Sequence, residues 1–126
     1  MKVILTHERA DLDALASLLG AHLLYPDAFA VLPREVNRNG AAYLHHYGSE
    51  LGFTKLNQLP QDSISEILLV DTQSMVTLKG ITAQTHVRVI DHHPLRENLP
   101  TEWEADLQNT GACTTLLVEK IKTEKI

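Results

Sequence analysis

Short apolar runs alternate along this chain with longer segments in which apolar residues recur every three or four positions. The runs at residues 3–5, 67–70 and 87–90 are dominated by valine, isoleucine and leucine, and their length fits strands. Strands of this kind are buried on both faces, which is typical of a parallel sheet covered by helices. The alternation therefore predicts an α/β fold: a three-layer, doubly wound, mainly parallel sheet of about five strands with helices on both faces.

The same two patterns, short apolar runs and apolar residues at every third or fourth position, predict the remaining elements. We expect helices at residues 11–24, 36–51 and 111–122, and further strands at residues 28–32 and 102–107. Gly40 is a weak point within the second helix, and Gly52 would end it. Residues 53–59 are ambiguous and could form a short strand, whereas residues 75–78 could form one helical turn.

Composition narrows the class of protein. A length of 126 residues fits one domain with a sizeable core, and the formal net charge of -5 argues against a broadly basic nucleic-acid surface. A nucleotide substrate stays compatible with this charge, since bound divalent cations would reverse it locally. Cys113 is the single cysteine, so no internal disulfide can form, and no apolar stretch approaches the roughly 18 residues of a membrane span. We therefore predict a cytoplasmic protein with no membrane contact.

Acidic and histidine residues stand where three of the predicted strands end. In parallel sheets, binding sites gather at the carboxyl ends of the strands. Carboxylate oxygens mixed with imidazole nitrogens suit Mn²⁺, Mg²⁺ or Zn²⁺. More than four candidate ligands suggest two metals, about 3.5–4 Å apart and bridged by one carboxylate, as used for phosphoryl hydrolysis. The candidates are His7, Asp11 and Asp13 after the first strand, Asp71 after the next, and Asp91, His92 and His93 before Pro94.

Each acidic residue taken alone also has a structural interpretation. Asp11 stands where a helix N-cap is expected, and Asp13 would be a favourable charge in the first turn of that helix. Asp71 and Asp91 could each stabilise a turn after a strand. None of these roles explains why all the candidates fall at strand ends together.

The segment around Cys113 opens the last predicted helix. Its free backbone N–H groups could bind an anion, although capping by Thr110 or Thr114 is favoured by these residues alone. A cysteine nucleophile is weaker still, because no dedicated base accompanies it.

Taken together, these residues resemble the DHH family of phosphoesterases, which includes RecJ-like exonucleases, oligoribonucleases, exopolyphosphatases and manganese pyrophosphatases. The resemblance covers nearly the whole chain, and the first motif is most similar to the branch in which this domain precedes regulatory domains and a tRNA nucleotidyltransferase-like domain. The motifs in order are Thr6-His7-x-x-Ala10-Asp11-x-Asp13-Ala14, the strand-end Asp71, Asp91-His92-His93-Pro94, and Gly111-Ala112-Cys113-Thr114-Thr115.

The resemblance implies a role for each site residue. Two Mn²⁺ ions, or Mg²⁺ in their place, would activate the attacking water. His93 would contact the scissile phosphate, and Asp91 would orient a histidine ring. Gly111 and Thr114 would lie beside the substrate. The implied ligands are His7, Asp11 and Asp71 for one ion, and Asp13, Asp71 and His92 for the other, with Asp71 bridging.

The chain departs from the family pattern in one respect. It offers no further aspartate beyond the glycine-containing helix and no basic C-terminal substrate-binding domain. We therefore interpret residues 1–126 as a DHH N-terminal domain belonging to a longer chain, and a homodimer is possible.

Three functions remain open on this evidence. The leading hypothesis is a metal-dependent phosphoesterase that hydrolyses a phosphodiester or phosphoanhydride, in a phosphate-containing small molecule or an oligonucleotide end. The second is a catalytically incomplete nucleotide- or metal-binding module with a regulatory or dimerisation role. The third is a flavodoxin-like structural domain with incidental acidic loops.

Overall fold

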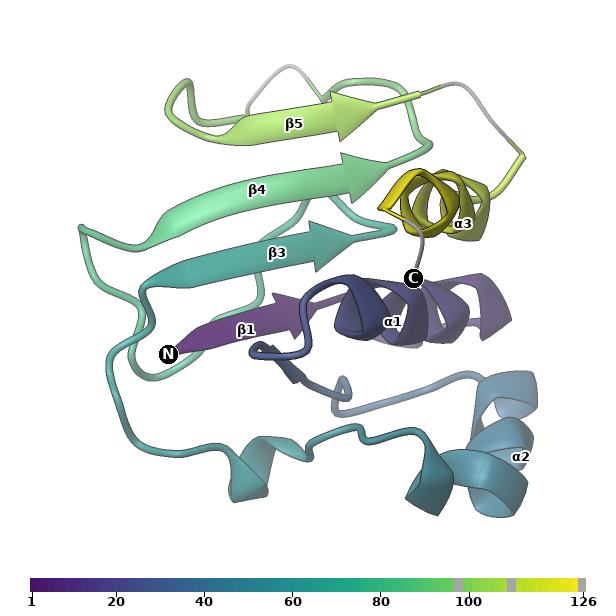
Figure 1. Ribbon diagram of the computed structural model, residues 1–126. Coiled ribbons are helices and arrows are strands. Elements are labelled where there is room, and N and C mark those ends of the chain that lie inside the picture. Colours follow the sequence, from purple (N-terminus) through teal and green to yellow (C-terminus); the bar gives the residue numbers. More distant parts are fainter. Residues whose placement is uncertain (97–98, 109–110, 125–126) are drawn as a thin grey trace.

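The computed structural model describes residues 1–96, 99–108 and 111–124, and its centre is a five-stranded, all-parallel sheet (Figure 1). The strand order is β2-β1-β3-β4-β5, so the most apolar strands occupy the middle. This architecture confirms the predicted α/β class and the number of strands. The strands are β1 (Lys2–Leu5), β2 (Phe29–Ala30), β3 (Glu66–Val70), β4 (His86–Asp91) and β5 (Glu104–Leu107).

Helices connect and cover the strands, and side-chain caps set where two of them begin. Asp11 Oδ1 accepts a hydrogen bond from the Ala14 N–H at 2.9 Å, and Asn37 Oδ1 accepts one from the Gly40 N–H at 2.8 Å. Both caps precede the first helical residue, as expected for N-caps. The α-helices are α1 (Leu12–Leu24), α2 (Arg38–Tyr47) and α3 (Cys113–Glu124), and the 3₁₀ helices are η1 (Gly48–Glu50) and η2 (Leu56–Gln58).

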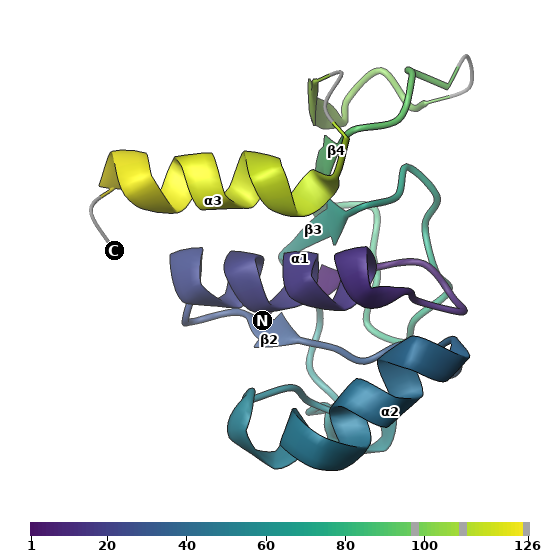
Figure 2. The same ribbon diagram turned by 90° about the vertical axis from the view of Figure 1, so that its right-hand side faces the viewer.

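The two faces of the sheet are covered differently. Helices α1 and α3 lie side by side across one face (Figures 1 and 2), where the fully buried Leu18 and Leu117 share a core cluster with Leu68 of β3. On the opposite face Leu69 packs beneath η2 and connecting segments, to which Leu56 contributes. The molecule therefore has three layers, with α-helices on one side and a 3₁₀ turn with loops on the other.

Two predicted elements differ in detail from the structure. Residues 75–78 form no helical turn; instead Met75 and Leu78 pack from a loop onto the second face of the sheet. Their three-residue spacing resembles that of a helix, but a loop crossing a sheet can place side chains at the same interval. The strand predicted at 28–32 is reduced to Phe29–Ala30 at the sheet edge, with Val31 making one bridge to Thr54.

Gly40 lies within α2, where the helix packs tightly against its neighbours. A Cβ atom there would lie 3.0 Å from the Ala10 carbonyl oxygen and 3.0 Å from Leu15 Cδ1. Gly52 ends the η1 segment with φ +72, a conformation that glycine adopts without strain. Among the described residues, no helix is long and apolar enough to cross a membrane.

Candidate metal centre

The three central strands end level with one another, which brings their following residues to one edge of the sheet. Leu5 of β1 pairs with Leu69 of β3, and Val70 of β3 pairs with Ile90 of β4. The segment after β1 carries His7 and leads to Asp11 and Asp13, whereas β3 is followed at once by Asp71. Strand β4 ends at Asp91, and His92 and His93 follow it.

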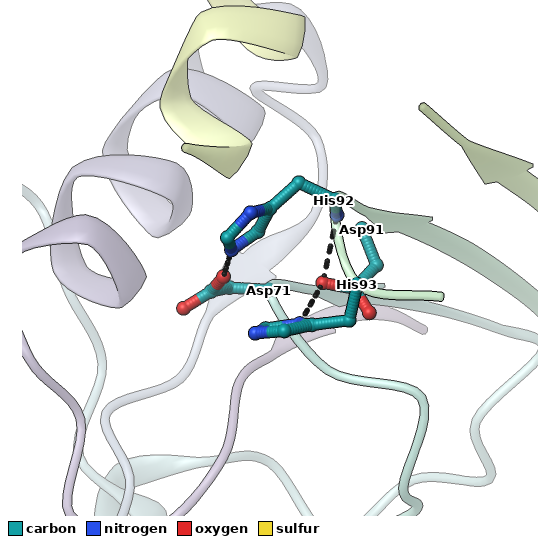
Figure 3. A group of neighbouring side chains, drawn as sticks. All are labelled: Asp71, Asp91, His92 and His93. Atoms are coloured by element: carbon teal, nitrogen blue, oxygen red, sulfur yellow. Dashed lines mark hydrogen bonds and ion pairs between the residues drawn. The ribbon is translucent and has the colours of Figure 1, made fainter. Parts of the chain in front are cut away.

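Asp71 occupies the middle of this edge and is 3% exposed. Its Oδ2 lies 3.2 Å from His7 Nε2, and its Oδ1 lies 3.1 Å from His92 Nε2 (Figure 3). The ligand atoms of His7, Asp11 and Asp71 all lie within 4.8 Å of one another. One buried carboxylate thus faces a histidine after β1 with one oxygen and a histidine after β4 with the other.

The backbone of Asp71 is unusual in a way that suits this position. Its φ is +59, in the left-handed region that aspartate and asparagine enter more readily than most residues. The Asp71 N–H donates to the Ile90 carbonyl at 3.0 Å, and the Thr6 hydroxyl donates to the Val70 carbonyl at 2.8 Å. The turn out of β3 is therefore held by β4 and by the segment after β1.

His7 and Asp71 influence each other's protonation. Hydrogen bonding to Asp71 raises the pKa of His7 to about 9, against the opposing effect of burial. Burial in turn raises the pKa of the Asp71 carboxyl, which the hydrogen bond from His7 counteracts in part. The pair therefore retains a proton at neutral pH, which a cation bound between these side chains would displace.

Asp13 reaches the site from the first turn of α1 and also holds the start of α3. Its Oδ1 accepts hydrogen bonds from the Thr114 hydroxyl at 2.6 Å and the Thr114 N–H at 3.0 Å, and its Oδ2 accepts one from the Cys113 N–H at 3.1 Å. Burial alone would raise the pKa of Asp13, but these hydrogen bonds outweigh it and lower the pKa. The same Oδ2 lies 3.7 Å from His92 Nε2.

The start of α3 is therefore engaged with Asp13. The backbone N–H of Thr114 donates to this carboxylate, and Gly111 is exposed at the turn before the helix. The substrate-binding roles of Gly111 and Thr114 stay predictions, and Thr110, the alternative cap, lies outside the described residues.

Asp91 is fully buried, and hydrogen bonds to both of its oxygens hold its carboxylate in place. Oδ1 accepts from His93 Nδ1 at 2.7 Å and from the His92 N–H at 2.9 Å (Figure 3). Oδ2 accepts from Gln73 Nε2 at 2.9 Å. The His93 side chain is 54% exposed and lies at the surface of the site, where the buried Asp91 carboxylate holds it through a hydrogen bond.

Gln73 is the site residue that the sequence did not reveal. It lies two positions after Asp71 and is 5% exposed. Glutamine is common in surface loops, so nothing in the sequence distinguished Gln73 from an exposed loop residue.

Cys113 is excluded as a nucleophile by its surroundings. Its thiol is fully buried and donates to the Ile90 carbonyl at 3.3 Å. Burial raises the pKa of this thiol to about 12, so the reactive thiolate is scarce at neutral pH.

The donor set fits divalent cations. Asp71 Oδ1 is buried and accepts no hydrogen bond from the described residues, although His92 Nε2 lies 3.1 Å away. A buried carboxylate oxygen costs free energy unless a positive charge, from an imidazolium or a metal ion, lies beside it. Carboxylate oxygens with imidazole nitrogens, and no thiolate facing them, favour hard or borderline cations.

Comparison with known proteins assigns the chain to a class. The family model described as "DHH family, N-terminal domain" matches residues 2–125. An A-adding tRNA nucleotidyltransferase of Aquifex aeolicus (strain VF5) is 34% identical over 127 residues, covering 99% of this chain and 14% of the relative. One of Geobacter sulfurreducens (strain ATCC 51573 / DSM 12127 / PCA) is 30% identical over 133 residues, covering 100% of this chain and 15% of the relative. The chain thus spans only a small part of the length of these relatives.

Proposed function

Because this chain belongs to the DHH family, whose N-terminal domain it matches over residues 2–125, we propose that it is a metal-dependent phosphoesterase domain. The observation that carries the proposal is the position of Asp71, whose two oxygens face His7 at 3.2 Å and His92 at 3.1 Å. The chain would be the N-terminal domain of a longer protein, since it aligns with only 14% and 15% of two relatives.

Asp71 is suited to bridge two ions because its two oxygens face histidines from different strands. His7 and Asp11 would complete the site on the Oδ2 side, and their ligand atoms lie within 4.8 Å of one another and of Asp71. Asp13 and His92 would complete the site on the Oδ1 side, where they lie 3.7 Å apart. Oxygen and nitrogen ligands of this kind suit Mn²⁺ or Mg²⁺.

The reaction would be hydrolysis of a phosphodiester or phosphoanhydride. Two bound cations supply Lewis-acid stabilisation and a water of lowered pKa. His93, held through Nδ1 by Asp91, would as an imidazolium donate from Nε2 to a phosphate oxygen and stabilise the charge that develops there. Attack by water at phosphorus forms one P–O bond and breaks another, and the leaving oxygen takes up a proton.

A nucleotidic substrate is favoured over an inorganic one. The relatives carry the name A-adding tRNA nucleotidyltransferase, so they handle nucleotides and RNA. We therefore propose that the substrate is a nucleotide or an oligonucleotide end, and that Gly111 and Thr114 lie beside it.

The substitution Asp71→Asn tests the metal assignment. Asparagine has the same shape and tolerates the left-handed backbone, so the fold should persist while the bridging charge is lost. We expect the variant to lose both Mn²⁺ binding, measured by calorimetry, and turnover of a nitrophenyl phosphodiester. Asp62→Asn, at an exposed aspartate next to the Ser63 carbonyl that binds the N-terminus, is the matched control.

Two results would change the interpretation. An Asp71→Asn chain that still binds two Mn²⁺ ions would refute the bridging role. A wild-type chain that binds two ions but hydrolyses neither the diester nor a short oligonucleotide would instead identify a binding module. A binding module is the second candidate function because the chain covers only 14% and 15% of the two relatives.

A further inference from the structure

Gln73 lies in the loop after β3, where its amide is buried and bonded at both ends. Nε2 donates to Asp91 Oδ2 at 2.9 Å, to the Pro94 carbonyl at 3.0 Å and to the His93 carbonyl at 3.3 Å. Oε1 accepts a hydrogen bond from the Arg96 N–H at 2.9 Å. A glutamine held in this way cannot turn without breaking several buried hydrogen bonds at once.

The partners determine which way the amide points. The neighbours of Nε2 are a carboxylate and two carbonyls, which only accept hydrogen bonds, and the neighbour of Oε1 is an N–H, which only donates. A flipped amide would place its oxygen against the Asp91 carboxylate and its NH₂ group against the Arg96 N–H. Gln73 is therefore a hydrogen-bond donor to Asp91.

The hydrogen bond from Gln73 fixes the orientation of the Asp91 carboxylate, so that only Oδ1 faces the two histidines. With Oδ2 bonded to Gln73, Oδ1 faces His93 Nδ1 at 2.7 Å and the His92 N–H at 2.9 Å. A carboxylate that accepts from Nδ1 fixes the ring orientation and favours the tautomer with the proton on Nδ1.

We propose that Gln73 is a positioning residue, which fixes the Asp91 carboxylate and the 93–94 backbone and thereby sets the ring orientation and tautomer of His93. The inference rests on the proposed function in one respect, which is that His93 contacts a phosphate of the substrate. It also links two strands of the site, because Gln73 follows the same strand as Asp71, whereas His93 follows β4.

Three variants separate hydrogen bonding from packing. Gln73→Met keeps the size of the side chain but cannot donate, and Gln73→Lys restores a donor to Asp91. Gln84→Met, at an exposed glutamine, is the matched control. The tautomer of His93 is read from its ¹⁵N ring resonances in the metal-free chain, in a buffer alkaline enough to keep the ring neutral.

We expect the wild-type chain, Gln84→Met and Gln73→Lys to carry the proton on Nδ1 of His93, and Gln73→Met to lose this preference. Phosphodiester turnover should fall at least tenfold in Gln73→Met and recover in Gln73→Lys. A folded Gln73→Met chain that keeps the Nδ1–H tautomer would overturn the inference. If the wild-type chain binds no Mn²⁺, the proposed function fails while the tautomer comparison still stands.

A second measurement requires no variant. The side-chain NH₂ protons of Gln73, buried and hydrogen-bonded, should exchange with water much more slowly than those of the exposed Gln84. Equally fast exchange at the two glutamines would also overturn the inference.

Discussion

Asp71 combines burial, a left-handed backbone and two imidazole neighbours in a single residue. Burial disfavours the charge of a carboxylate, and a positive φ is uncommon outside glycine. Strained or desolvated residues of this kind concentrate at functional sites, where the surrounding structure holds them in place. The hydrogen bonds on either side of Asp71 supply that support here.

The coupling of His7 to Asp71 predicts a specific titration. In the metal-free chain, His7 should titrate near pH 9, and Asp71→Asn should bring its pKa toward the ordinary value of about 6.5. Because the folded-state pKa is raised, the charged ring stabilises the fold fully below about pH 6.5, and this contribution is lost as the pH rises through about 9. NMR titration of the histidine ring protons measures both values. A wild-type His7 that titrates near 6.5 would contradict the hydrogen bond to Asp71.

The sequence predicted that certain residues would lie close together, but it did not predict the individual hydrogen bonds that hold them. Strand-end position alone located His7, Asp71 and His92, because parallel strands deliver their carboxyl ends to one edge. It could not show that Asp13 would also hold the start of α3, since that contact joins residues about 100 positions apart. The buried state of Gln73 was equally hidden, because it depends on where the segment after β4 folds back.

Helices α1 and α3 together hold Asp13, one of the proposed metal ligands. Gly20 of α1 lies against α3, where an added Cβ would stand 3.1 Å from Leu117 Cβ. The same two helices are joined at their first turns by the Asp13 carboxylate and Thr114. The distance between the helices therefore bears on the position of one predicted ligand.

Gly20→Leu should force these helices apart. Overpacking of a close contact costs about 1–3 kcal/mol, so we expect a loss of at least this size in the free energy of unfolding, measured with urea. Gly48→Leu is the matched control, because a Cβ there meets only the Leu44 side chain, at 3.7 Å. Equal stability of the two variants would show that α1 and α3 do not need this close approach.

At the level of elements, the sequence predicted types more reliably than lengths. The buried strands β3 and β4 lie where they were predicted, because apolar runs of that length fit a buried strand and are too short for most helices. Strand β2 is shorter than predicted: it lies at the edge of the sheet, pairs with β1, and is continued only by an isolated bridge from Val31 to Thr54. The covering of the second face by loops could not be read from the chain, because loop side chains carry no regular period.

For the whole molecule, the metal centre and the fold should stabilise each other. The proposed ligands come from residues far apart in the sequence, so the unfolded chain presents no such site. A ligand that binds only the folded state stabilises it by about 2.7 kcal/mol at a free concentration 100 times its Kd. We expect Mn²⁺ to raise the thermal midpoint of the wild-type chain, a chelator to reverse this, and Asp71→Asn to show no shift. A midpoint unaffected by Mn²⁺ in the wild type would count against a metal centre.

The parallel arrangement of the strands also separates Met1 from the rim that carries Asp71. Met1 lies where β1 begins, and its amino group donates to the Ser63 carbonyl at 2.9 Å, beside the start of β3. Because every strand runs in the same direction, this point is at the opposite rim from the end of β3 (Figure 1), which Asp71 follows directly. A purification tag or surface linker attached at Met1 would therefore leave the rim that carries Asp71 facing solution, ready for immobilised binding assays.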